Sequence, residues 1–505
     1  MSEAVTGEKN PPVSAYNRFS LRRRPLWLDL GLTVGGSAGA GFSAALLFGV
    51  PASFSQPLAT FLAGTGALGA GSLAYLNGQR SRTQSENHHQ ADMDRERERH
   101  REDTHRAQET DLRNRYTAIA AQIADSSAAI RQAGVYALTA LADDWYRFGE
   151  AEERQVCINL LQWYLRVPFP TETSHTRPDL PEYEIRQTIV TILIERRHRA
   201  PDHPRSWAGT SISMRQASLP GCDLFRYDLS HLDLTRANLI NAILTGANLT
   251  SAKLIDANLT GAGLTGANLS EADLIGAILV GATLHVTNLT DADLSEADLT
   301  RAILTDANLT NAQLPHAKLT GADLTNATLN SAYMTSTDLT DANLTSARLL
   351  QANITDANLT RARLNIANLT GAYLSDSKLI DAHLTDAYLA GADLASADLT
   401  RAVLTRANLT SANLTDANLN SVDLSSAHLR AANLTDADLT EAKLTRAQLM
   451  HADLTRANLT RADLTNADLT GADLTGADLT GANLTGILNG PGTQWPVGST
   501  PSTPQ

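Results

Sequence analysis

Ala467-Asp-Leu-Thr-Gly471-Ala-Asp-Leu-Thr-Gly476 repeats a five-residue unit, Ala-(Asp/Asn)-Leu-(Thr/Ser)-X, that continues in register over residues 217–485. The central position is leucine throughout about 54 consecutive units, except for the apolar residues Met334 and Ile354. No insertion or deletion interrupts the run. The sequence therefore predicts a stacked core that tolerates no shift of frame.

A period of five matches neither the α-helix nor the β-strand. It suits a coil that turns a corner every five residues, with four sides and about 20 residues per coil. Coils stacked at the spacing of a β-sheet would give a rod of about 65 Å. We expect the leucine and the preceding alanine to point inward, and the other three residues to face water. A disordered low-complexity tract is the alternative, but such tracts do not keep one apolar position over about 270 residues.

The repeated unit resembles the motif A(D/N)LXX of the pentapeptide-repeat family, and the resemblance covers residues 217–487. That family folds as a right-handed quadrilateral β-helix, so the resemblance implies a mainly β fold. Its members include DNA-mimicking proteins that protect gyrase, but most have no known activity. The resemblance therefore predicts the fold more strongly than the function.

Two apolar runs, Leu30–Val50 and Leu58–Leu76, precede the repeats. Each is long enough to cross a bilayer, and arginines flank their outer ends, which predicts both termini in the cytoplasm. After a basic tail over residues 1–25, we expect a two-helix transmembrane hairpin over residues 26–77. A buried soluble hairpin is one alternative, because glycine and alanine lower the hydrophobicity, and a cleaved signal peptide is another.

Between these runs and the repeats, mixed charge predicts a helical stalk over residues 78–112. Amphipathic periodicity predicts a small α-helical domain over residues 113–200, in which Ile130–Leu138 resembles a HEAT-like helix. This layout is similar to bacterial, chiefly actinobacterial, membrane proteins of unknown role. We expect the helical domain to cover the open edge of the first coil. Residues 201–216 are predicted as a linker, and residues 488–505 as a disordered tail.

The sequence offers no candidate catalytic, cofactor-binding or metal-ligating residues. It has no phosphate-binding loop, nucleophile elbow or zinc spacing. The two cysteines, Cys157 and Cys222, give no disulfide framework, and Cys222 occupies an inward position of the repeat. The histidines between residues 88 and 105 lack ligand spacing and are interpreted as part of a solvated face. The sequence therefore predicts that the protein is not an enzyme and needs no cofactor.

Charge is concentrated in the repeats. The whole chain has a formal net charge of −13, while residues 217–487 contain 30 acidic and 16 basic residues. The side of the coil that is built around Leu234 and its twenty-residue successors has 12 acidic and 3 basic residues. We name this the acidic side. It either attracts a basic partner or only keeps the rod soluble. Its acids include Asp233, Asp273, Asp293, Glu296, Asp393, Asp436, Asp453 and Asp473.

Together these features predict a non-enzymatic scaffold for protein interaction, tethered in the plasma membrane, that presents a rigid acidic rod to the cytoplasm. The alternative is a DNA-mimicking inhibitor or protector of a topoisomerase such as gyrase. Duplex DNA would carry about 38 charges over about 65 Å, roughly three times the net charge of the repeats. Direct binding of nucleic acid is not expected, and a transporter is disfavoured because the apolar runs contain no charge.

The C-terminal coil has no recognisable cap. An open coil edge exposes unpaired backbone groups. We therefore expect a weak homodimer, in which the last units, Leu469–Leu484, pair with the same units of a second copy. The alternative is that Ile487, Leu488 and the proline-rich tail fold over the edge and keep the chain monomeric.

Overall fold

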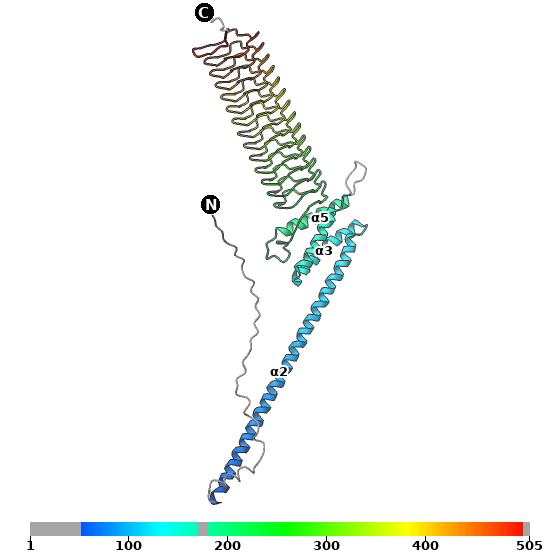
Figure 1. The fold of residues 1–505 in the computed structure, drawn as a ribbon. Coiled ribbons are helices and arrows are strands. Elements are labelled where there is room, and N and C mark those ends of the chain that lie inside the picture. The colour runs from blue at the N-terminus through cyan, green and yellow to red at the C-terminus, as the bar shows by residue number, and fades with distance from the viewer. Residues whose placement is uncertain (1–51, 170–179, 498–505) are drawn as a thin grey trace, which may run out of the picture. The chain divides into compact units, whose positions relative to one another are not determined.

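The computed structural model describes residues 52–169 and 180–497. In this part, helices precede a long stack of coils (Figure 1). Contacts divide the chain into two units, Met1–Ala107 and Gln108–Gln505, and the stack belongs to the second. The helices are α2 (Ala52–Ile123), α3 (Ala128–Phe148), α4 (Ala151–Arg166) and α5 (Leu180–Arg197).

The first unit is described only through helix α2. Residues 78–112, the predicted stalk, lie within this helix. Side chains 69–107 are exposed, and ion pairs join neighbouring turns, for example Arg95 to Asp92 at 3.2 Å. Pairs of this kind between exposed side chains add little stability.

The part of the chain that the structure describes does not contain the predicted membrane hairpin. None of the helices in residues 52–169 and 180–497 combines the length and the apolar character that crossing a bilayer requires. The apolar run Leu58–Leu76 forms part of α2, and its glycines and alanines lower its hydropathy. The other run, Leu30–Val50, lies outside the described residues. The prediction of a plasma-membrane location is therefore wrong.

The stack is a solenoid in which each residue of the Asp/Asn position, up to Asp468, pairs with the residue twenty positions later. All these β-bridges are parallel, as between Asn358 and Lys378. The next residue, Leu359, donates its N–H to the carbonyl of Lys378 at 2.6 Å. Two turn residues separate one bridge from the next, so a coil of twenty residues turns four times. Four bridge ladders therefore run along the stack.

Leucine and alanine fill the interior of the solenoid. Leu359, in the middle of the stack, is fully buried, as the sequence predicts. Cys222 also lies in the core, which confirms its inward position. Polar residues at the alanine position are bonded: the Thr287 hydroxyl donates to the Leu264 carbonyl at 2.9 Å. The buried hydroxyl of Thr287 is therefore hydrogen-bonded, as expected because burying an unpaired hydroxyl would lower stability.

The Asp/Asn position has a structural role that goes beyond facing water. In the unit Ala397–Arg401, four of the five N–H groups donate to backbone carbonyls. The fifth belongs to Thr400, and it donates to Oδ1 of Asp398 at 3.0 Å. The Thr400 hydroxyl donates to the same oxygen at 2.5 Å. The consensus therefore combines Asp/Asn with Thr/Ser because the backbone ladder leaves one N–H per unit without a carbonyl acceptor. The prediction that the Asp/Asn side chain only faces water is corrected accordingly.

The fifth residue of each unit occupies the left-handed region of backbone conformation. Its φ is +57° at Arg401 and similar at the fifth position of the other units. Glycine takes this conformation without strain, and asparagine and aspartate take it more readily than other residues. The sequence agrees, because glycine, asparagine and aspartate are frequent there. Two β-branched residues depart from the rule: Val286 at φ +56° and Ile366 at φ +61°.

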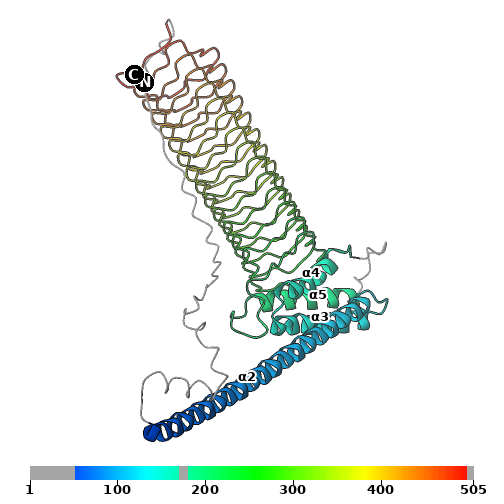
Figure 2. The same ribbon diagram turned by 60° about the horizontal axis from the view of Figure 1, so that its bottom comes forward.

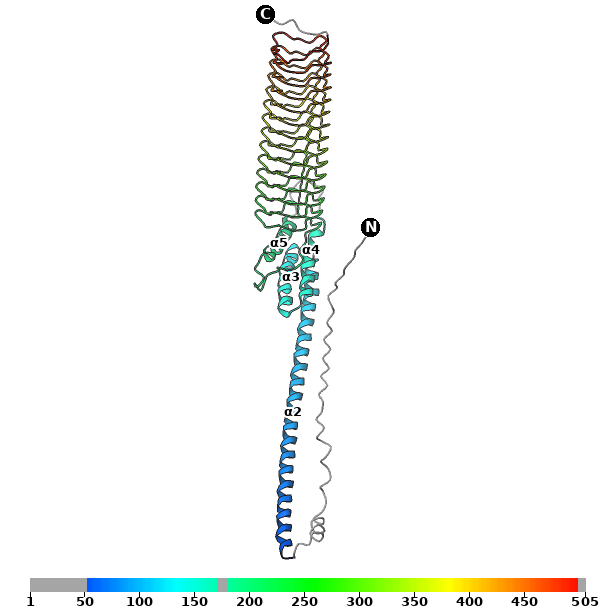
Figure 3. The same ribbon diagram turned by 60° about the vertical axis from the view of Figure 1, so that its left-hand side comes forward.

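The helical domain caps the N-terminal edge of the solenoid, as predicted. Figures 2 and 3 show α4 and α5 beside the first coils. The Gln187 side chain bonds both backbone groups of Asp223: its Nε2 donates to the carbonyl at 2.6 Å, and its Oε1 accepts from the N–H at 2.9 Å. Arg186 donates to the Ser218 carbonyl at 2.8 Å. Side chains of α5 thus take the place of a preceding coil.

A buried network holds this cap together. Glu182 accepts from Arg186 Nε at 2.7 Å, from the Tyr164 hydroxyl at 2.8 Å and from Arg131 Nη2 at 3.0 Å. Burial, together with the bond to Glu182, raises the pKa of Tyr164 to about 12. Because α3, α4 and α5 each supply a member, the network ties the three helices to the first coil.

The segment after α5 is packed rather than free. Residues 201–216 are predicted as a linker, yet Trp207 is fully buried. Its backbone N–H donates to the Arg196 carbonyl at 2.8 Å, and its indole N–H donates to Asp143 at 3.3 Å. The part of the segment around Trp207 therefore packs on the helical domain, while the N–H groups of Met214 and Gln216 already donate to carbonyls of the first coil.

The tail covers part of the C-terminal edge. The sequence predicts disorder from residue 488, but Leu488 and Gln494 continue two of the bridge ladders, and Ile487 is buried. Leu488 pairs with Asp468 and Gln494 pairs with Asp473, both in the last coils. Leu479 and Leu484 stay half-buried, and their N–H groups have no acceptor among residues up to 497. The homodimer through this coil stays a prediction.

Candidate interaction surface

The acidic side carries a real excess of negative charge in the folded chain. Two of its three basic residues are already paired with acids of the same side: Arg236 lies 3.2 Å from Asp256, and Arg456 pairs with Asp436. Partial burial alone would raise the pKa of Asp453, but hydrogen bonds from threonines outweigh it and lower this pKa. The other ten acids of this side form no ion pair with a residue that the structure describes.

A different edge of the solenoid has balanced charge. Asp341 accepts two bonds of 2.7 Å from Arg361, one coil later, and Asp381 accepts in the same way from Arg401. These bonds lower the pKa of Asp341 and of Asp381. Here acids and bases alternate along the stack, so the negative charge of the solenoid is not uniform.

A group of exposed apolar side chains interrupts the polar surface in the middle of the solenoid. We name it the mid-rod patch. Its side chains are between 41 and 53% exposed. Two of its tyrosines flank Asn353 on the acidic side, because Asn353 bridges to Tyr333 on one side and to Tyr373 on the other. The patch consists of Tyr333, Leu350, Ile366, Tyr373 and Tyr388.

The other members of the patch lie within one coil of these tyrosines. Leu350 is three residues before Asn353 in the same coil. Tyr388 bridges to Asn368, and Ile366 is two residues before that asparagine. The patch therefore spans two adjacent sides of the solenoid and the corners beside them.

Four residues of the patch occupy positions of the repeat where their side chains lower the stability of the fold. Tyr333, Tyr373 and Tyr388 occupy the Asp/Asn position, where tyrosine cannot accept the N–H two residues later. A hydrogen bond of this kind contributes about 1 kcal/mol. Tyrosine does suit a β-ladder, but Ile366 is a β-branched residue in the left-handed region, which costs about 1–2 kcal/mol. Because these side chains are exposed, burial of apolar surface offsets little of the lost stability.

Three acidic residues lie beside the patch on the acidic side. Asp356 and Asp376 occupy corners of the coils that contain Asn353 and Tyr373, and Asp393 bridges to Tyr373. None of the three acids forms an ion pair with a residue that the structure describes. The patch is thus apolar at its centre and negative on the acidic side, whereas the exposed Arg348 adds a positive charge on the neighbouring side.

The described residues give no sign of a metal or nucleophilic site. In residues 52–169 and 180–497, no three histidine, cysteine, aspartate or glutamate side chains are close enough together to hold a metal ion. Burial raises the pKa of the Cys157 and Cys222 thiols to about 12, so both are protonated at neutral pH. The prediction that the chain is not an enzyme is left untested by these observations.

Comparison with known proteins identifies the solenoid. The family model described as Pentapeptide repeats matches eight copies within residues 233–486, which is the region of bridged five-residue units. The chain belongs to the pentapeptide-repeat family. No protein among those with curated functions matches the chain.

Solved structures of other pentapeptide-repeat proteins are similar to parts of the chain. HetL of the cyanobacterium Nostoc sp. strain PCC 7120, involved in regulation of heterocyst differentiation, is 36% identical over 42% of this chain and 90% of its own, with a TM-score of 0.26. Rfr23 of Cyanothece 51142 is 41% identical over 19% of this chain and 63% of its own, with a TM-score of 0.15. QnrB1, a plasmid-mediated fluoroquinolone resistance protein, is 18% identical over 35% of this chain and 92% of its own, with a TM-score of 0.22.

Sequence reasoning located the acidic side but missed the mid-rod patch of this pentapeptide-repeat protein. The signal was available: tyrosine stands at the Asp/Asn position three times between residues 333 and 388. Without the twenty-residue ladder these tyrosines look scattered, because the first two are forty positions apart. Only the stacking of coils brings them together.

Proposed function

We propose that this pentapeptide-repeat protein is a non-enzymatic interaction protein that binds a protein partner at the mid-rod patch. The observation that carries the proposal is that four of the five exposed apolar residues of the patch have a cost to the fold. The three tyrosines forgo the acceptor of the Asp/Asn position, and Ile366 takes a left-handed backbone conformation. Residues kept in costly conformations at the surface point to a function other than stability.

The chemistry of the patch defines the partner. Aromatic residues are enriched at the centres of protein interfaces, where they supply most of the binding energy. The acids at the rim favour approach of positive charge. We therefore propose a folded partner that presents an apolar centre, with lysine or arginine where it meets these acids. The solenoid supplies a rigid platform on which these side chains keep their spacing.

The platform itself is proposed to be a right-handed quadrilateral β-helix. The twenty-residue register and the four turns per coil support a four-sided cross-section. The right hand is what resemblance to the family implies. A β-helix of this kind has a core filled by leucine and alanine, so the proposed function uses only its outer surface.

A DNA mimic is not favoured by the charges of the surface. A mimic of a duplex needs phosphate-like charge along its length. Alternating pairs such as Asp341 with Arg361 instead neutralise one edge, and the centre of the acidic side carries tyrosine. These features fit a partner with an apolar contact better than a partner that recognises a phosphate backbone.

Proximity labelling in the native cell tests the proposal, with the full chain as bait. The double variant Tyr373→Asn and Tyr388→Asn removes the aromatic centre of the patch. The matched control is Ile303→Asn, which also restores the consensus at an exposed position, 41% exposed, but outside the patch. We expect a basic protein that is labelled by the wild type and by Ile303→Asn, and lost from the double variant. If the double variant labels the same proteins as the wild type, the patch is not the docking site.

A further inference from the structure

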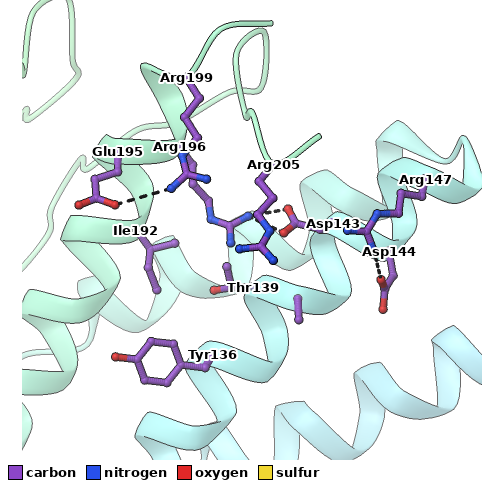
Figure 4. Close-up of a pocket in the computed structure, with 11 residues that line it drawn as sticks. Tyr136, Thr139, Asp143, Asp144, Arg147, Ile192, Glu195, Arg196, Arg199 and Arg205 are labelled. Carbon is purple, nitrogen blue, oxygen red and sulfur yellow. Dashed lines mark hydrogen bonds and ion pairs between the residues drawn. The ribbon is translucent and has the colours of Figure 1, made fainter. Parts of the chain in front are cut away.

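The helical domain contains a pocket that the proposed function does not use. It has a volume of about 350 Å³ and lies between α3 and α5, with Arg205 from the following segment (Figure 4). This size is within the range of pockets that hold small ligands. Its lining is rich in arginine, although the chain as a whole is acidic.

The acids of the pocket are already engaged. Asp143 is buried and accepts two bonds from Arg196 Nη1, at 2.5 and 2.6 Å. Asp144 accepts from Arg115 at 2.9 Å and from Arg147 at 3.1 Å. Each of these two carboxylates is therefore paired with arginines other than Arg199 and Arg205.

Two arginines of the pocket have no strong partner. Arg199 lies 4.0 Å from Glu195, whose side chain is exposed, so this pair is weak. The guanidinium of Arg205 forms no ion pair with any residue that the structure describes. Figure 4 shows both side chains beside the ion pair of Arg196 and Asp143.

The backbone holds these two cations near each other. The Ser206 hydroxyl donates to the Arg199 carbonyl at 2.9 Å, and the Ser206 carbonyl accepts from the buried Arg154. The neighbouring Trp207 is fixed by its bond to the Arg196 carbonyl. Like charges placed close together by a rigid segment repel each other, and an anion between them relieves that repulsion.

We propose that this pocket binds the phosphate or carboxylate group of a small organic anion, with Arg199 and Arg205 as its principal ligands. The planar guanidinium donates two parallel hydrogen bonds to either group. Tyr136 and Ile192 line the same pocket and offer an apolar surface to the organic part. This inference concerns a different site from the mid-rod patch and does not depend on the proposed function.

Isothermal titration calorimetry of the full chain tests the inference, with inorganic phosphate and phenyl phosphate as probes. We expect both to bind, and phenyl phosphate to bind more tightly because its ring contacts Tyr136. Arg205→Gln and Arg199→Gln should each weaken binding by about tenfold, the value of one charge-assisted hydrogen bond. Both residues are surface arginines, so the variants should fold, which circular dichroism checks.

The control is Arg166→Gln, which removes the same charge from an exposed position of α4 outside the pocket. It should leave binding unchanged. If neither probe binds, or if Arg166→Gln weakens binding as much as Arg205→Gln, the pocket is not an anion site. If inorganic phosphate and phenyl phosphate bind equally, the organic part of the proposal is wrong.

Discussion

The ordinary units of the solenoid and the units of the mid-rod patch share one core but differ at the surface. In an ordinary unit such as Ala397–Arg401, every backbone N–H has an acceptor, and the aspartate supplies the last one. In the patch, tyrosine replaces that acceptor, and Ile366 takes a backbone conformation that suits glycine. The comparison teaches that the core specifies the fold, while departures at the surface mark the place where function can be sought.

The largest effect should come from the core that both regions share. Leu359→Asp would bury an unpaired carboxylate, and we expect a loss of at least about 4 kcal/mol. Limited proteolysis should then cut within the solenoid near residue 359. An intact solenoid in this variant would contradict the inward assignment of leucine and, with it, the common core on which the comparison rests.

The N-terminal cap differs from both regions, because a single network of side chains stabilises it, whereas the coils are stabilised by repeated identical contacts. Arg186→Ala removes donors to the first coil and leaves Glu182 with one cation fewer, so we expect a cost of about 3 kcal/mol. Hydrogen exchange should rise in the helical domain and first coils while the patch stays protected. Uniform loss of protection along the stack would show that the cap does not act locally.

An ordinary unit should lose stability when its acceptor is removed. Asn358 accepts from the N–H and hydroxyl of Thr360 and donates to the Thr340 hydroxyl at 2.8 Å. Asn358→Ala should cost about 1 kcal/mol, measured as a lower thermal midpoint. The matched change in the patch, Tyr373→Ala, removes no such bond and should cost less. Equal losses would remove the basis for distinguishing the two regions.

The smallest expected effect is a gain. Ile366→Asn should relieve the left-handed strain and stabilise the chain by up to about 1 kcal/mol. Val286→Asn, at the same corner four coils earlier, is the control for the strain alone. Both variants should raise the midpoint of thermal unfolding. A lower midpoint for Ile366→Asn would mean that the isoleucine supports the fold.

Much of the fold could be predicted from the sequence because identical units must stack in register. The inward leucines, the twenty-residue coil and the helical cap all follow from one unbroken period and its open edge. The partners of that edge could not be predicted, since Arg186 and Gln187 look like ordinary polar residues of an amphipathic helix. The buried Trp207 was missed for a similar reason: composition alone makes residues 201–216 look like a linker.

The candidate site was harder to predict than the fold. Charge along the sequence located the acidic side, because its residues recur at one phase of the repeat. The patch needed the ladder, which places Tyr333, Asn353 and Tyr373 in one row. The membrane hairpin was the clearest error: length favoured it, but the glycine-rich run of α2 lacks the apolar character that the interpretation required.

We infer that the residues of the patch are kept at a cost to the stability of the solenoid. The thermal midpoint of the full chain with Tyr333→Asn, Tyr373→Asn and Tyr388→Asn tests it most directly, because asparagine restores the consensus acceptor without adding charge. The account predicts a midpoint at or above that of the wild type. A clearly lower midpoint would show that the tyrosines stabilise the solenoid and would contradict the claim that they serve an interaction.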